Sequence, residues 1–240
     1  FIDALSNTVP QNQITYDHEL TQISFIDGHF VLKFGDSDAK TVTAGNVIIC
    51  APLRRMVEQV TWNGLLNDEA QAVMKAAPTW MATQTKVSVL YAHPFWRQRG
   101  LSGRVASQLG PLTEIHDHCS HDETHSALFG FLGWPGQAQG SDQLKQSIVQ
   151  QLVRCFGEDA AKPERIEIQD WSTHPYICSN IDRQMPAEHP QVLPALVREG
   201  RCNGLLVFGV AETADQHPGL IDGALQSGER AALQVLSNIG

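Results

Sequence analysis

The strongest constraint on the fold of this chain lies near its C-terminal end, between Leu205 and Ala232. The apolar run from Leu205 to Phe208 has the length of a short strand, and polar and breaker residues follow it up to His217-Pro218-Gly219. A helical pattern comes next, with one predicted apolar face that comprises Leu220, Ala224, Ala231, Val235 and Leu236. A strand, a turn and a helix in this order direct the helix N-terminus past the end of the strand. Free N–H groups and a partial positive charge at such a terminus suit an anionic or electron-rich ligand.

Glycines are unusually frequent in this predicted helix. Gly219, Gly223 and Gly228 each lower helix propensity by up to ~1 kcal/mol. A helix tolerates this loss when another body must approach its backbone closely. An ordinary α/β connection with small residues for packing gives the same pattern, so the residues alone leave both interpretations open.

The same stretch resembles a known signature. Phe208-Gly-Val-Ala-Glu212-Thr213-Ala214, followed by Gly219-x3-Gly223-Ala224-x3-Gly228-Glu-Arg-Ala-Ala232, is similar to the C-terminal flavin-binding signature of flavin-containing amine oxidases. The resemblance implies that FAD is the cofactor, with the acidic residue beside its ribityl-pyrophosphate part and the helix N-terminus directed at its isoalloxazine ring. The cofactor-binding residues it implies are Glu212, Thr213, Gly219, Leu220, Ile221 and Gly223.

A single charged residue interrupts a long strand pattern earlier in the chain. Residues 80–91 read as one strand, Lys86 is its only charge, and His93-Pro94-Phe95-Trp96-Arg97 ends it. By residue type alone, a lone lysine in a strand is an outward, solvated residue. In the resembling family, however, a lysine lies ten residues before the Trp of a Pro-Phe-Trp motif and holds a water against flavin N5. Lys86 and Trp96 have this spacing, so the resemblance implies that Lys86 is catalytic.

A third matching segment contains the candidate substrate-site residues. The Trp171-x4-Tyr176 pattern resembles the family's segment beside the flavin. Some members continue with a Cys that carries a covalent flavin link and a Tyr that forms one wall of an aromatic cage. Asn180 and Ile181 take those two places here. We therefore expect non-covalent FAD and a substrate site with Trp171, Tyr176 and Ile181; core and turn packing is the alternative for the two aromatic residues.

Residues 116–125 are rich in potential metal ligands. They include four His, one Cys and three acidic residues, which could bind zinc or nickel. The segment reads as a loop without the rigid spacing of known metal motifs, and the matching position in the resembling family is a plain hairpin turn. The sequence therefore predicts no metal site.

Composition excludes several classes of function. The net charge is −9 and no run of Lys or Arg occurs, so nucleic-acid binding is not expected. No apolar run approaches ~18 residues, which argues against a membrane span, and the N-terminal residues do not form a signal peptide. Five widely spread cysteines without a CxxC pair favour reduced thiols and a cytoplasmic location.

The coarse pattern along the chain predicts an α+β fold. Residues 12–49 read as a β-meander with strands at 13–16, 22–26 and 29–34, a hairpin turn at Asp27-Gly28 and a second turn at 35–38; a buried strand is predicted at 46–50. Helices are predicted at 67–77, with Asn67 as the candidate N-cap, and at 142–156, with Ser141 as the cap and Gly157 as the stop. We expect a substrate domain with a mainly antiparallel or mixed sheet and flanking helices, plus a C-terminal strand and helix that belong to the FAD-binding domain. The predicted divisions are 1–51, part of the FAD-binding domain; 52–200, substrate binding; and 201–240, cofactor contact.

One family feature is missing from the sequence. No Gly-x-Gly-x-x-Gly turn, which would hold the FAD pyrophosphate, occurs in the 240 residues. The resemblance covers nearly the whole chain but maps only to the family's C-terminal half, and Phe1 stands where an initiator methionine would be expected. We therefore expect a piece of a longer protein, a missing N-terminal dinucleotide-binding domain as its partner, and FAD that this piece alone does not retain.

Three functions remain open at this point. The first is a flavin amine oxidase that transfers hydride from a C–N bond of a small amine-like substrate to FAD, with O₂ as acceptor. The second is a non-catalytic substrate-domain fragment without cofactor. The third is a flavin desaturase or a protoporphyrinogen-oxidase-like enzyme, against which the paired Lys86 and Pro-Phe-Trp motif favours amine oxidation.

Overall fold

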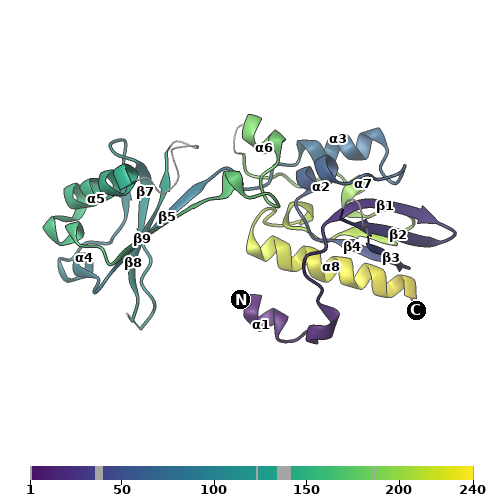
Figure 1. Cartoon of the computed structure of the whole chain (residues 1–240), viewed down its shortest axis with the longest axis horizontal. Helices are drawn as coiled ribbons and strands as arrows, with labels where there is room; N and C mark the ends of the chain where they lie inside the picture. Colours follow the sequence, from purple (N-terminus) through teal and green to yellow (C-terminus); the bar gives the residue numbers. More distant parts are fainter. Residues whose placement is uncertain (1, 36–39, 123, 134–141, 186–187, 240) are drawn as a thin grey trace. The chain divides into compact units, whose positions relative to one another are not determined.

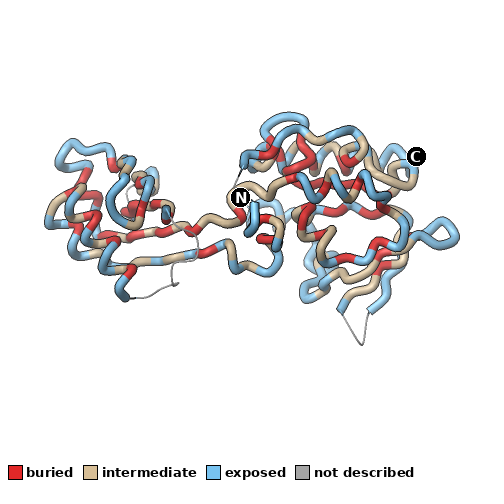
Figure 2. The backbone as a smooth tube through the Cα atoms, turned by 90° about the horizontal axis from the view of Figure 1, so that it is seen from above, coloured by how far each residue is buried: buried red, intermediate tan, exposed pale blue. Residues whose placement is uncertain are grey.

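The computed structural model describes residues 2–35, 40–122, 124–133, 142–185 and 188–239, and the chain forms two compact units (Figure 1). The first unit comprises Phe1–Pro78 and His189–Gly240, and the second comprises Thr79–Glu188. Figure 2 shows that buried residues are concentrated in each unit separately. These boundaries differ from the predicted divisions, because residues 52–78 and 189–200 belong to the first unit. The function assigned to each division stays a prediction.

An antiparallel meander forms one side of the first unit. Its strands are β1 (Leu20–Ile26), β2 (His29–Phe34) and β3 (Lys40–Ala44). The predicted Asp27-Gly28 turn is confirmed: both residues have positive φ, at 50° and 80°, as a tight hairpin turn requires. The predicted strand at 13–16 is wrong: Gln13 ends the 3₁₀ helix η1 (Gln11–Gln13), and residues 14–16 form no regular element. Part of the predicted turn at 35–38 lies outside the described residues.

Two short parallel strands connect distant parts of the first unit. Strand β4 (Val47–Ile49) pairs in parallel with β10 (Leu206–Phe208), in the register Val47↔Leu206. The predicted buried strand at 46–50 and the predicted strand at 205–208 are thus confirmed; β4 is one residue shorter at each end, and β10 begins one residue later. The side chains of β10 are fully buried, which agrees with their continuous apolar sequence.

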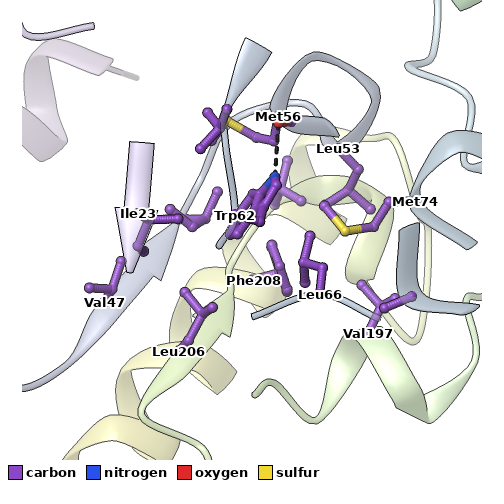
Figure 3. Close-up of a cluster of buried hydrophobic side chains, with 14 of the residues drawn as sticks. Ile23, Val47, Leu53, Met56, Trp62, Leu66, Met74, Val197, Leu206 and Phe208 are labelled. Atoms are coloured by element: carbon purple, nitrogen blue, oxygen red, sulfur yellow. Dashed lines mark hydrogen bonds between the residues drawn. The ribbon is translucent and has the colours of Figure 1, made fainter. Parts of the chain in front are cut away.

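Three helices complete the core of the first unit (Figure 3). They are α2 (Leu53–Gln59), α3 (Asp68–Ala76) and α7 (Ala195–Arg198). Helix α3 confirms the prediction at 67–77, including its cap: the Asn67 side chain accepts a hydrogen bond from the Ala70 amide at 3.0 Å. Trp62 lies inside this core and donates its indole N–H to the Met56 carbonyl at 3.2 Å.

Helix α8 (Ile221–Ile239) follows the 3₁₀ turn η4 (Ala211–Thr213) and ends the described chain. Its predicted apolar face is wrong in part. The buried residues are Gly223, Ser227 and Ala231, whereas Leu220 and Leu236 are 41% and 63% exposed. Small residues face the unit because the helix backbone packs closely against it, which leaves the large apolar residues outside. The short helix α1 (Ile2–Ser6) also exposes its apolar side chains.

The second unit is built on one antiparallel sheet with the strand order β6-β7-β8-β5-β9. The strands are β5 (Thr85–Tyr91), β6 (Val105–Ala106), β7 (Leu112–Asp117), β8 (Ser126–Leu132) and β9 (Arg165–Asp170). The predicted strand at 80–91 begins only at Thr85, since Met81 adopts a positive φ of 59° in the turn before it. The antiparallel α+β class is confirmed.

One face of this sheet is covered by helix α5 (Asp142–Phe156). The apolar side of α5 packs on Val87 and Val89, and the buried Gln151 side chain pairs with both backbone groups of Leu112, at 2.8 and 2.7 Å. The predicted helix at 142–156 is confirmed, and Gly157, with φ 87°, follows its last residue. Its predicted cap, Ser141, lies outside the described residues. The remaining elements are α4 (Phe95–Gln98), η2 (Glu158–Ala161), η3 (Trp171–Thr173) and α6 (Asn180–Gln184).

Within the described part of the chain, no helix combines the length and the apolar character needed to cross a membrane.

Candidate functional site

Lys86 lies on the sheet face opposite to α5. Side chains alternate along β5, and Val87 and Val89 point into the core with α5. Lys86 is therefore directed to the other face, where it is paired with Phe131 on β8 and with Gln169 on β9. Lys86 is half-buried at this position. Its side chain is directed outward from the α5 core, as its residue type alone predicts, but it is only partly solvated.

One aromatic ring contacts this lysine on the sheet face, and three further rings contact that ring. The Lys86 Nζ lies 4.3 Å from the centre of the Phe129 ring, a distance typical of a cation–π contact. His116 stacks on Phe129 at 5.0 Å, while His118 and Phe131 meet it edge-on at 5.1 and 5.7 Å. Sequence reasoning missed these four rings. The alternation of Phe129 and Phe131 was the available signal, but only the strand register places them beside Lys86.

The Pro-Phe-Trp-Arg motif lies in the core on the α5 side and has a structural part. Trp96 is fully buried and donates its indole N–H to the Asp117 carboxylate at 2.7 Å, and Arg97 binds both carboxylate oxygens at 2.7 Å. Burial tends to raise the pKa of Asp117, but the hydrogen bonds from Arg97, Trp96 and the Cys119 amide outweigh it and hold that pKa well below its usual range. The motif thus joins the end of β5 to β7.

The predicted substrate-site residues follow β9 directly. Asp170 pairs with Thr85, and the Trp171 amide donates to the Gln84 carbonyl at 3.1 Å. This places η3 next to the end of β5 that carries Lys86. Trp171 is 38% exposed and Tyr176 is 55% exposed, and the His174 ring lies near both, at 5.7 and 6.1 Å. The pair is therefore a surface aromatic group, not part of the core.

Ile181 lies at the start of helix α6 and is half-buried. The preceding residues fix the helix by a capping box, in which the Ser179 hydroxyl and the Asp182 carboxylate bind each other's backbone amides at 2.9 and 3.0 Å.

The predicted cofactor-binding residues form a corner between β10 and α8 in the first unit. Glu212 and Thr213 are buried in the turn η4. Gly219, with φ 79°, donates its amide to the Ala211 carbonyl at 3.1 Å and so closes the loop. A side chain at Gly223 would lie 2.3 Å from the His217 carbonyl oxygen. This glycine therefore allows the backbone of the chain's own 214–217 turn to approach the helix closely. Ile221 is 70% exposed, which leaves the N-terminus of α8 accessible.

One further residue of this corner was not assigned a role from the sequence. Arg230 on α8 donates to the carbonyl oxygens of Arg198 and Phe208 at 2.6 and 2.7 Å, and to the Thr213 hydroxyl at 3.0 Å. Arg230 stands within the quoted Gly228–Ala232 signature, but nothing in the sequence shows which backbone groups it reaches.

A family model described as flavin containing amine oxidoreductase matches residues 1–236 of the chain. The chain belongs to this family. Among its curated relatives, a provisionally assigned flavin-containing monoamine oxidase of Mycobacterium tuberculosis, AofH, is 28% identical over 88% of the chain and 45% of the relative. An L-amino acid dehydrogenase of Synechocystis is 24% identical over 95% of the chain and 45% of the relative.

Solved structures show the same fold. Cyclohexylamine oxidase from Brevibacterium oxydans superposes on the present chain with a TM-score of 0.80, at 17% identity. The superposition covers 98% of the present chain and 52% of the oxidase. Putrescine oxidase bound to putrescine gives a TM-score of 0.66 over 91% and 48%, at 18% identity. The chain thus spans about half the length of the relatives it matches.

The family is defined by flavin, and the residues of this member fit one part of FAD. The corner offers an accessible helix N-terminus beside the buried Glu212. The helix end suits the carbonyl oxygens of the flavin ring and the negative charge that the ring gains on reduction, and the carboxylate suits the hydroxyl groups of the ribityl chain. The Gly-x-Gly-x-x-Gly turn for the pyrophosphate is absent from the sequence. In the His-rich segment, among the residues that the structure describes, no three potential ligands come close enough to hold a metal ion; Glu123 lies outside them.

Proposed function

We propose that this chain carries the substrate-binding half of an FAD-dependent amine oxidase. The observation that supports this most directly is the position of Lys86, which lies on the sheet face opposite to α5, beside Phe129 and next to the Trp171 turn. A cationic donor that rests on an aromatic ring between two neighbouring strands is limited in the orientations that it can adopt. Such a fixed position is what a group that acts on a bound reactant needs.

FAD would be held non-covalently by the corner that contains Glu212, Thr213 and residues 219–223. Glu212 would serve the ribityl chain, and the start of α8 at Ile221 and Gly223 would serve the ring. The amides of Gly219 and Leu220 already donate to the Ala211 and His217 carbonyls, so these two residues would shape the corner around the cofactor. When bound, FAD would supply the redox chemistry: it would take the hydride from the C–H bond next to the amine nitrogen, so that the C–N bond becomes an imine, and the two electrons would pass with two protons to O₂ to give hydrogen peroxide. Asn180 stands where a covalent link would need Cys.

The residues of the chain would bind and orient the other reactants. The Lys86 ammonium would donate hydrogen bonds to a water and deliver a proton where negative charge develops. Trp171 and Tyr176 would pack against the carbon skeleton of a small amine-like substrate and exclude water from it. Ile181 would offer an apolar contact in place of a second aromatic wall.

The partner of this half would be a dinucleotide-binding polypeptide that is not contained in the sequence. Two features of the first unit support this. Parallel sheets occur almost always as larger assemblies covered on both faces, whereas β4 and β10 form a sheet of two strands. Helix α8 also exposes Ile221, Leu225, Leu233, Leu236 and Ile239, an apolar surface of the kind that marks a contact.

Two other functions have support of their own. The absent pyrophosphate-binding turn favours a non-catalytic fragment that binds no cofactor. The L-amino acid dehydrogenase among the relatives favours an enzyme that passes electrons to an acceptor other than O₂. The desaturase or protoporphyrinogen-oxidase-like alternative has no comparable observation in its favour.

The visible spectrum after loading with FAD and gel filtration tests the proposal. We would compare this chain with the polypeptide encoded by its complete reading frame. We expect a flavin band near ~450 nm only in the longer polypeptide, and hydrogen peroxide when amines are added in air. A longer polypeptide that stays colourless would defeat the oxidase proposal and leave the non-catalytic fragment. A yellow polypeptide that oxidises amines without peroxide would favour the dehydrogenase.

A further inference from the structure

A single guanidinium connects three separate segments in the first unit. Arg230 Nη1 donates to the Arg198 carbonyl at 2.6 Å, at the end of α7. Its Nη2 donates to the Phe208 carbonyl at 2.7 Å, at the end of β10, and to the Thr213 hydroxyl at 3.0 Å, in η4. The side chain therefore ties α8 to the strand, to the turn and to the preceding helix.

The Thr213 hydroxyl extends this connection into the backbone of the corner. It is fully buried, and its oxygen lies 2.7 Å from the Val210 carbonyl and 3.0 Å from the Phe208 carbonyl. Its one proton can serve only one of these acceptors at a time. The N–H of Arg230 satisfies Phe208 when the hydroxyl turns to Val210. The two side chains thus keep the carbonyls at the end of β10 paired although the strand stops there.

Lysine cannot replace this arrangement. The planar guanidinium presents donors in fixed directions from two nitrogens, whereas an ammonium is a single point at the end of a flexible stem. The surroundings also demand a donor that keeps its charge easily. Burial lowers the pKa of Arg230 and so does the charge of Arg198, while the nearby Asp215, which is itself paired with Arg198 at 2.7 Å, raises it. An arginine stays charged in such a place because its ordinary pKa is far above that of lysine.

We propose that Arg230 is a positioning residue for the cofactor corner: it fixes residues 208–214 against α8 and thereby sets where Glu212 and the start of α8 lie relative to each other. The role at the cofactor rests on the proposed function. The fixation of the corner rests only on the hydrogen bonds. The fixation and the role at the cofactor can therefore be tested in separate experiments.

Amide hydrogen exchange of this chain without flavin tests the fixation. The reporters are the amides of Gly209, Thr213 and Gly219, which bind Ile49, Val210 and Ala211. Replacing Arg230→Lys removes charge-assisted bonds, so we expect these amides to exchange about ten- to a hundredfold faster. Amides of β1 and β2 should be unchanged.

Two further variants control this experiment. Arg55→Lys, in the same unit, keeps a charge that can still pair with Glu58 and should leave every reporter amide unchanged. Thr213→Val removes only the hydroxyl and should increase exchange at the same three amides, which keeps the test decisive if Arg230→Lys does not fold. Unchanged exchange of these amides in both Arg230→Lys and Thr213→Val overturns the inference.

The rate of FAD release from the polypeptide of the complete reading frame tests the role at the cofactor. We expect Arg230→Lys to release FAD at least about tenfold faster, while the thermal unfolding of the β1–β3 meander is unchanged. Arg55→Lys should match the wild type in both measurements. Faster exchange with unchanged FAD release overturns the positioning role. A wild type that binds no FAD defeats the proposed function, while the exchange result still decides whether Arg230 fixes the corner.

Discussion

The Lys86 ammonium lies 4.3 Å from the centre of the Phe129 ring, on the sheet face that α5 does not cover. The two residues come from neighbouring strands, because Ser88, two residues after Lys86, is the partner of Phe129 in the β5–β8 register. The contact is therefore a diagonal pair on one face of an antiparallel sheet. It defines the part of the second unit where the proposed chemistry would take place.

Replacing Lys86→Met should separate activity from stability. The side chain is half-buried and contacts an aromatic face, so its loss should change the free energy of unfolding by less than ~1 kcal/mol. If Lys86 positions a water and delivers a proton, the reaction of the reduced flavoprotein with O₂ should slow about 10²-fold. Stopped-flow reoxidation measures this rate. The exposed Lys162→Met is the control for loss of charge, and equal rates in both variants would show that Lys86 has no such role.

Gly223 and Gly228 lie in the same helix, but alanine should change the free energy of unfolding in opposite directions at the two positions. A Cβ at Gly223 would lie 2.3 Å from the His217 carbonyl oxygen and 3.0 Å from the Ala214 side chain. The backbone of the cofactor corner would have to move, so Gly223→Ala should destabilise the first unit by about 2 kcal/mol or more.

A Cβ at Gly228 would have no neighbour within 4 Å. Gly228→Ala should therefore stabilise the isolated chain by up to ~1 kcal/mol through helix propensity alone. Urea unfolding of the two variants measures both effects. The same sign for both would mean that α8 does not pack on the 214–217 turn as the structure shows.

Asp117 should make the second unit sensitive to acid. Its pKa in the folded chain lies below the usual range, whereas an unfolded Asp titrates near ~3.9. A carboxyl group with a depressed folded pKa stabilises the fold above the unfolded pKa, and this contribution is lost as the pH falls below about 4. At pH 6 the Asp117→Asn variant should be less stable by about 2 kcal/mol.

The pH dependence of that difference checks the assignment. The gap in unfolding free energy between wild type and Asp117→Asn should shrink steadily as the pH falls from 4 toward 2. Glu164→Gln, at an exposed position outside the helices of the same unit, should show no such gap. A gap of constant size across this range would mean that the Trp96 and Arg97 contacts do not depend on the carboxylate charge.

The exposed apolar side of α8 should make the isolated chain self-associate. Leu225 and Leu236 are 43% and 63% exposed on one helix, and apolar surfaces of this kind associate in water. The double variant Leu225→Asp/Leu236→Asp should be monomeric at protein concentrations where the wild type is not. Its unfolding free energy should change by less than ~0.5 kcal/mol.

Sedimentation velocity over a range of concentrations measures this association. Val42→Asp, which changes a half-exposed apolar residue on strand β3 of the same unit, should associate like the wild type. A wild-type chain that stays monomeric at all concentrations would show that this side of α8 needs no partner.

The sequence by itself determined the elements whose signals are local. The hairpin around Asp27-Gly28, the helix capped by Asn67 and the helix that ends before Gly157 each carry their own turn, cap or periodicity within a few residues. The family signature at 208–232 is local in the same sense, and the family match confirms it. Where local signals were weak, as at residues 13–16 and 80–84, the predicted strands were wrong.

Only the tertiary structure decided which faces meet. The parallel pairing of β4 with β10 joins segments far apart in the chain, and the register of β5 with β8 brings Phe129 to Lys86. The periodicity of α8 identifies an apolar face, but the helix buries Gly223, Ser227 and Ala231 instead. Periodicity records which side chains are apolar, whereas burial depends on how closely a distant backbone approaches. For the same reason Arg230 gains its three acceptors only when α7, β10 and η4 are assembled around it.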